Sequence, residues 1–203
     1  MTHLDQWACN HAMPLAGGTG TTPTALESLV PLLHAPFDPV GVAVADIVTV
    51  PGQVVISFLL VLAACWRLWR REREDAAAAW MAVWIFAVAV EVFCRHVLTR
   101  APLYRAGTHL VGFDTSWPSG HSLRCVLVAA ALAAAWPRFR PPLAVWLVAA
   151  IALTELAGFH PPTDLLGGLL LATVAVAGAV AIEKSGFLGR RAALRRARSR
   201  TRG

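Results

Sequence analysis

Two short polar segments carry side chains that could transfer a proton or attack an electrophile. The first reads Trp117-Pro118-Ser119-Gly120-His121. Serine is a favoured N-cap residue, and the free N–H groups of a helix's first turn form a site for anions. Gly120 would let the backbone approach a ligand closely, and His121 could give a proton to a leaving oxygen. This segment therefore predicts an anion site with a general acid at the start of a helix.

The second segment reads His160-Pro161-Pro162-Thr163-Asp164. Proline is tolerated in a first helical turn, so this spacing can place Asp164 about one turn from His160. A carboxylate there could hold the proton on one imidazole nitrogen and leave the other nitrogen free as a nucleophile. The segment therefore predicts a nucleophilic histidine with a carboxylate that orients it.

The elements that position these segments must cross a membrane. The chain has 203 residues, of which 57% are hydrophobic and 15% charged, and a mean hydropathy of +0.58. This composition is too apolar for an ordinary soluble protein. Its four cysteines form no CxxC pair and have no metal-ligand spacing, so the sequence predicts no metal site and no disulfide framework. No cofactor is expected.

We expect an all-α, integral membrane helical bundle of about five transmembrane helices, because five apolar stretches approach the ~20 residues that a span requires. These stretches are 51–69, 76–98, 119–136, 142–159 and 164–182. Upstream, 24–34 and 38–50 look like N-terminal interfacial helices. A sixth span over 41–65 is an alternative, although it would place Asp46 and the Pro51-Gly52 break inside the hydrocarbon.

The expected organisation has three parts. Residues 1–23 form a flexible N-terminal arm, 24–184 the membrane domain and 185–203 a basic cytoplasmic tail. Four Lys or Arg residues lie in the last turn of the first span or just after it, two follow the third span and eight follow the fifth, so fourteen of eighteen lie on one side. The positive-inside rule makes that side cytoplasmic and places both histidine segments at the outer face. Because orientation explains the net charge of +6, we expect no nucleic-acid partner.

Tryptophan and glycine residues in the spans have structural explanations. Five tryptophans near span ends are expected to lie at the membrane interfaces: Trp66, Trp69, Trp80, Trp117 and Trp136. Three glycines of the last span are expected to allow close helix packing: Gly167, Gly168 and Gly178.

Pro-Ser-Gly-His followed by His-x-x-x-Asp resembles the second and third signature motifs of the type 2 phosphatidic acid phosphatase superfamily, in its membrane lipid phosphatase branch. Members of this superfamily are lipid phosphatases and phosphotransferases that use no metal and pass through a phosphohistidine. The resemblance covers residues 76–182. It implies that His160 is the nucleophile, Asp164 its orienting carboxylate and His121 the general acid, while Ser119 and Gly120 hold the phosphate.

The first and third motifs are degenerate. The family's first motif is Lys, six residues, then Arg-Pro, whereas residues 95–102 read RHVLTRAP. Arg95 most resembles the lysine and Arg100 the arginine, and the resemblance implies that both bind phosphate. The third motif opens with Ser-Arg six or seven residues before its histidine, where this chain has Leu153 and Thr154. A phosphate-binding arginine is therefore missing.

Arg124 is our candidate to replace the missing arginine. It lies three residues after His121, on the same face of the third span, and a charge at that depth needs a partner. We expect it either to pair with Glu155 or to bind the phosphate directly. Glu91 and Arg95 have the i, i+4 spacing of a helical ion pair, whose purpose could be structural neutralisation.

The expected activity is hydrolysis of a phosphate monoester or diphosphate of a lipid, polyprenyl or glycerolipid, at the outer face of a bacterial inner membrane. A lipid phosphotransferase with the same nucleophile is an alternative, as is a catalytically degenerate phospholipid-binding protein. The expected partners are the membrane and a lipid phosphate. The sequence leaves the particular lipid and the oligomeric state open.

Overall fold

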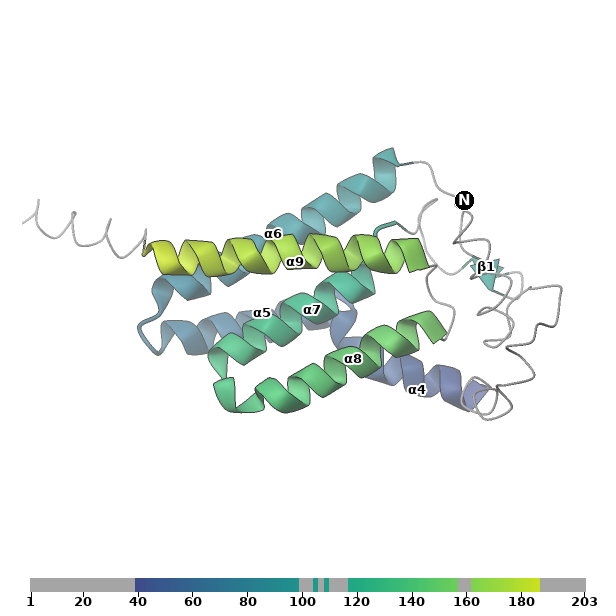
Figure 1. The fold of residues 1–203 in the computed structure, drawn as a ribbon, viewed down its shortest axis with the longest axis horizontal. Coiled ribbons are helices and arrows are strands. Elements are labelled where there is room, and N and C mark those ends of the chain that lie inside the picture. The colour runs from purple at the N-terminus through teal and green to yellow at the C-terminus, as the bar shows by residue number, and fades with distance from the viewer. Residues whose placement is uncertain (1–38, 99–103, 106–107, 110–116, 157–161, 187–203) are drawn as a thin grey trace, which may run out of the picture.

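The computed structural model describes residues 39–98, 104–105, 108–109, 117–156 and 162–186. The elements in this part of the chain are as follows (Figure 1): α4 Pro39–Thr49, the 3-10 turn η3 Val50–Gly52, α5 Val54–Trp69, α6 Glu74–Val97, β1 Tyr104–Arg105, β2 Thr108–His109, α7 Gly120–Ala135, the 3-10 turn η4 Pro137–Phe139, α8 Arg140–Leu156 and α9 Pro162–Ser185. The expected arm and nearly all of the expected tail lie outside the described residues.

Each of the five apolar stretches forms one helix, α5 to α9, which confirms a helical protein. Two helices, Glu74–Val97 and Thr163–Ser185, are long and apolar enough to cross a membrane. By contrast, α7 and α8 have 16 and 17 residues, which at 1.5 Å per residue reach about 24 to 26 Å, short of a ~30 Å hydrocarbon core. The expected count of five spans is therefore not confirmed.

The N-terminal part of the bundle is a bent helix pair. Ala43–Gly52 and Val54–Trp69 meet at 48° and together would be a third candidate span. The bend lies at the Pro51-Gly52 break that the sequence marks, since proline cannot continue the hydrogen-bond ladder of a helix. The other expected interfacial helix, 24–34, lies outside the described residues. On α8, the indole Nε1 of Trp146 donates to the carbonyl of Val48, 3.0 Å away, and so joins α4 to α8.

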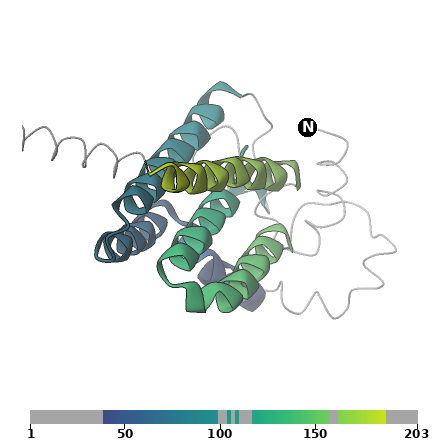
Figure 2. The same ribbon diagram turned by 60° about the vertical axis from the view of Figure 1, so that its left-hand side comes forward.

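The helix α7 is the centre of the bundle. It packs against α5, α6, α8 and α9 (Figures 1 and 2). Its buried residues lie on more than one face, as expected of a helix surrounded by neighbours. Large apolar side chains on the surrounding helices point outward instead, among them Phe86 on α6, Val148 on α8 and Leu170 on α9. Outward apolar faces around a packed interior suit a protein whose solvent is lipid.

A short antiparallel pairing of two strands lies within this otherwise helical protein. Tyr104 pairs with His109 and Arg105 with Thr108, in the connection between α6 and α7. Each strand has two residues. The pairing therefore shapes a connection and adds no sheet to the core.

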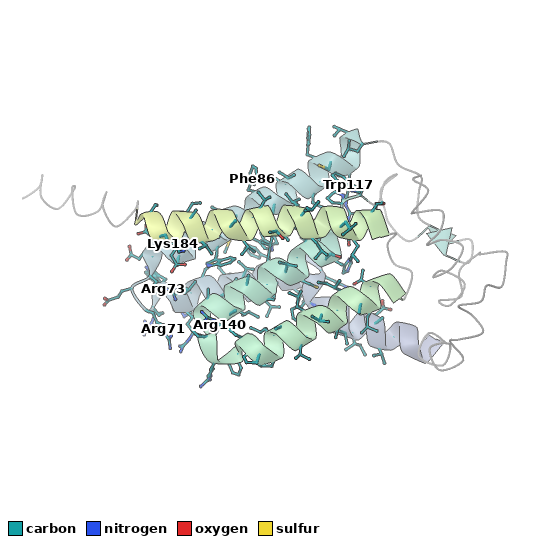
Figure 3. All side chains as sticks on the ribbon, viewed as in Figure 1. Arg71, Arg73, Phe86, Trp117, Arg140 and Lys184 are labelled. Carbon is teal, nitrogen blue, oxygen red and sulfur yellow. The ribbon has the colours of Figure 1, made fainter. Side chains whose placement is uncertain are left out.

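The two ends of the bundle differ in charge. Arg71, Arg73, Arg140 and Lys184 lie at one end and Trp117 at the other (Figure 3). This separation agrees with the charge pattern of the sequence. One expected interfacial tryptophan is misassigned, because Trp80 is 3% exposed and belongs to the hydrophobic core, one and a half turns inside α6.

Candidate active site

The Pro-Ser-Gly-His segment begins α7 as the sequence predicts. Ser119 is the N-cap, and its hydroxyl accepts a hydrogen bond from the backbone N–H of Ser122 at 3.4 Å. The two serine hydroxyls also lie 2.9 Å apart within hydrogen-bonding distance. Ser119 is fully buried, whereas His121, in the first turn, is partly exposed. The first turn of α7 is thus fixed by its own capping serine, and its histidine stays accessible.

The start of α9 lies directly beside the start of α7. The backbone N–H of Ser119 donates to the backbone carbonyl of Asp164 at 2.9 Å. Asp164 stands in the first turn of α9 and is 1% exposed. The two motif segments, 45 residues apart in the chain from Ser119 to Asp164, are therefore joined by a main-chain hydrogen bond.

Two glycines of α9 make this approach possible. A Cβ atom at Gly168 would collide with the carbonyl oxygen of Ser119, and one at Gly167 would lie 2.5 Å from the indole nitrogen of Trp117. The expected role of these glycines in close packing is confirmed. For Gly178 the same expectation is wrong, because a Cβ there would meet nothing within 4 Å.

Arg95 reaches the motif segment from α6. Its Nη2 lies 3.0 Å from the Glu91 carboxylate and 3.5 Å from the carbonyl oxygen of Pro118. The expected Glu91–Arg95 pair is thus present, and both side chains are buried. Arg95 also interacts electrostatically with Asp164. A buried guanidinium therefore stands beside both motifs, where an anionic substrate group would need it.

Arg124 has a partner that the sequence did not predict. Its Nη1 is ion-paired with the Glu91 carboxylate, and its Nε donates to the carbonyl of Gly52 at 2.5 Å. We expected Glu155 as partner, or the phosphate itself. The side chain of Glu155 lies outside the described residues, and Glu91 takes the place expected for it. Two of the three guanidinium nitrogens of Arg124 therefore already donate to the protein.

Glu91 was missed as a site residue, although its spacing to Arg95 indicated part of its role. Its carboxylate is ion-paired with arginines from two helices, Arg95 on α6 and Arg124 on α7. It also explains Gly120, because a Cβ at that position would collide with the Glu91 carboxylate. The sequence assigned Gly120 to close approach of a ligand. The structure shows that this glycine also makes room for a buried carboxylate.

Gly52 is the second residue that the sequence did not assign to the site. A Cβ there would lie 2.8 Å from the sulfur of Cys125 and 3.1 Å from the carbonyl oxygen of His121. The break between α4 and α5 therefore rests on the first turns of α7. Opening the helix at Pro51-Gly52 frees a carbonyl, and Arg124 uses it.

The structure thus brings six of the eight candidate site residues into one region: Arg95, Ser119, Gly120, His121, Arg124 and Asp164. The other two, His160 and Arg100, lie outside the described residues. Within the part of the chain that the structure covers, no group of three His, Cys, Asp or Glu side chains is placed to hold a metal ion.

Comparison with known proteins finds a similarity to one family over this region. The family model described as the PAP2 superfamily matches residues 94–185, which run from the last turn of α6 to the end of α9. No curated protein and no solved structure matches the chain. The matched range contains both motif segments, and Glu91 and Gly52 lie outside it.

Proposed function

We propose that this protein is a membrane lipid phosphatase. Its residues 94–185 match the PAP2 superfamily, whose members are generally phosphatases that act on phosphate esters. Its reaction would be hydrolysis of a lipid phosphate monoester or diphosphate through a phosphohistidine. The apolar helices agree with a substrate that arrives within the membrane. The lipid would be a polyprenyl or a glycerolipid.

The observation that supports this proposal best is the hydrogen bond from Ser119 to Asp164. It holds the second motif beside the first turn of α9, so His121 and Asp164 belong to one region. Arg95 adds a buried positive charge at the same place. A general acid, an orienting carboxylate and an arginine are the groups that an in-line phosphoryl transfer requires besides its nucleophile.

The proposed reaction has two steps. In the first, a ring nitrogen of His160 attacks phosphorus, the bond from phosphorus to the lipid oxygen breaks, and His121 protonates that oxygen. In the second, His121 takes a proton from a water molecule that attacks the phosphohistidine. The bond from phosphorus to nitrogen then breaks and inorganic phosphate leaves. Asp164 would hold the other ring nitrogen of His160 throughout.

Positive charge and N–H groups would stabilise the transferring phosphoryl group. In this proposal Arg95 and Arg100 bind its oxygens, together with the backbone N–H of Gly120, while the N–H of Ser119 stays bonded to the carbonyl of Asp164. Arg124 has a supporting place, because its bonds to Glu91 and Gly52 hold it within the protein.

The difference in charge between the two ends of the bundle supports a proposed orientation in the membrane. We place the basic end and the C-terminal tail in the cytoplasm of a bacterial cell, and the site at the outer face of its inner membrane. The positive-inside rule supports this orientation, and the described Arg and Lys residues at one end agree with it (Figure 3).

The test is phosphate release from a panel of lipid phosphates by the purified protein in detergent with EDTA present. We expect release by the parent and loss of at least ~100-fold in His121→Ala, since general acid–base catalysis contributes about 10²–10⁴-fold. His160→Ala should abolish turnover. The matched control is His96→Ala, because His96 is an exposed histidine in the last turn of α6 whose ring contacts the carbonyl of Val92.

Substrate labelled in its phosphate distinguishes the alternatives. A phosphatase should form an acid-labile, alkali-stable phosphoprotein that His160→Ala does not form. Transfer of the label to an added acceptor hydroxyl, in place of its release as inorganic phosphate, would identify a phosphotransferase. Binding without release or labelling would identify a catalytically degenerate lipid-binding protein and contradict the proposal.

A further inference from the structure

A groove lies at the end of the bundle opposite the candidate active site. Its volume is about 690 Å³, and it runs along the last three turns of α5 to the end of α7. Its apolar part is lined by Leu59, Leu62 and Ala63. Leu59 and Leu62 are half exposed, although they are large apolar side chains. This part of the groove is therefore suited to a hydrocarbon chain.

The polar end of the groove is formed by two arginines and two tryptophans. Arg67 lies over the ring of Trp136 at 5.3 Å, and Arg70 lies over that of Trp66 at 6.0 Å. Such cation–π contacts orient a guanidinium without neutralising its charge. The groove thus presents two oriented positive charges at one end of an apolar surface.

These two charges lack a counter-ion within the described residues. No ion pair there involves Arg67 or Arg70, and the Nε atom of Arg67 is buried without a hydrogen-bond partner. The neighbouring Arg73 differs, because it is ion-paired with Glu183 and also donates to the carbonyl of Ala134. A buried donor without a partner is costly. Arg67 is partly exposed and Arg70 is exposed, so an acceptor from outside the protein can approach both side chains.

The place of the groove indicates which molecule supplies the acceptor. It lies among the basic residues at one end of the helices, where Arg71, Arg73 and Arg140 are seen in Figure 3. In a membrane, the ends of apolar helices lie at the level of the lipid headgroups, and tryptophan and arginine are typical there. An acyl chain would point from that level along α5 toward the bilayer centre.

We propose that this groove binds an anionic glycerophospholipid. Its phosphate would accept from Arg67 and Arg70, and one acyl chain would lie along Leu59, Leu62 and Ala63. The lipid would be a bound, non-reacting component, since the candidate active site is at the other end of the bundle. This proposal depends on the membrane location and not on the proposed phosphatase activity.

The experiment measures lipid binding by the delipidated protein in a neutral detergent. Phosphatidylglycerol or phosphatidylcholine with the same acyl chains is added, and thermal unfolding and native mass spectra are recorded. We expect one phosphatidylglycerol to be retained and the unfolding temperature to rise, with no such effect of phosphatidylcholine. Combining Arg67→Gln with Arg70→Gln should weaken phosphatidylglycerol binding by about tenfold or more, since charge-assisted bonds to phosphate are lost.

Two further variants make the result specific. Arg71→Gln is the matched control. Arg71 is exposed in the turn between α5 and α6 and does not line the groove, so this variant should bind phosphatidylglycerol like the parent. Ala63→Phe should fill the apolar part and weaken binding with both arginines intact. Equal binding of phosphatidylcholine, equal stabilisation by inorganic phosphate, or equal loss in Arg71→Gln would each overturn the proposal.

Discussion

Glu91 is ion-paired with Arg95 on its own helix and with Arg124 on α7, and all three side chains are buried. Helical spacing predicted the first of these pairs, because residues four apart face each other whatever surrounds the helix. The second could not be predicted, since 33 residues separate Glu91 from Arg124 and sequence spacing does not say which faces of two helices meet. The sequence therefore predicted the pair of Glu91 with Arg95 but not its second pair, with Arg124.

Replacing Glu91→Gln should destabilise the protein by ~3–5 kcal/mol, the usual cost of removing one partner from a buried ion pair. Adding Arg124→Gln should recover part of this loss, because the double variant leaves only one buried arginine, Arg95, without the Glu91 carboxylate, whereas Glu91→Gln alone leaves two. Thermal unfolding in detergent measures both. Additive losses would contradict the coupling. Arg73→Gln is the control, because it breaks the exposed pair with Glu183 and should cost ~0–1 kcal/mol.

The start of α7 packs closely against two other segments, the start of α9 and the bend between α4 and α5. The start of α7 lies against α9 at Gly167 and Gly168, and it lies against the bend at Gly52. The sequence predicted the N-cap at Ser119 and the start of α9, because capping and proline rules are local. It also located the Pro51-Gly52 break. It could not predict that the break rests on α7, since this depends on tertiary packing.

Gly168→Ala should reduce phosphate release by at least tenfold. Even a methyl group at this position collides with the carbonyl of Ser119, so α7 and α9 must separate and the bond from Ser119 to Asp164 must lengthen or break. Release by purified protein measures this effect. Gly178→Ala is the control on the same helix, with open space for its methyl group, and it should be neutral or stabilise by ~0.4–1 kcal/mol. Equal behaviour of the two variants would refute the role of this close packing.

In the described part of the molecule, Arg71, Arg73, Arg140 and Lys184 lie at one end, and Trp117, just before α7, lies at the other (Figure 3). The hydropathy pattern predicted the helices α5 to α9 because burial in lipid requires runs of apolar residues. It did not settle how many of them cross the bilayer, since α7 and α8 fall short in length while α4 and α5 form a bent pair. The prediction of which end faces the cytoplasm therefore depends on the charges at the helix ends and not on the lengths of the apolar helices.

Cysteine labelling checks this orientation. Leu98→Cys, at the exposed end of α6, should react with an impermeant thiol reagent added to intact spheroplasts, whereas Arg71→Cys should react only after lysis. The parent is the control for its own cysteines, of which Cys65 and Cys125 are buried. The reverse pattern of labelling would place the motif segments in the cytoplasm.

The Glu91 ion pairs also bear on how the chain enters the membrane as it is synthesised. Glu91 and Arg95 leave the ribosome together on α6, so this helix can partition into lipid with its charges already balanced. The later helix α7 carries Arg124 without an acid of its own. Because Glu91 is made earlier, on α6, Arg124 can pair with the same carboxylate when α7 packs against α6. The packing of this short, charged helix thus depends on the helix made before it.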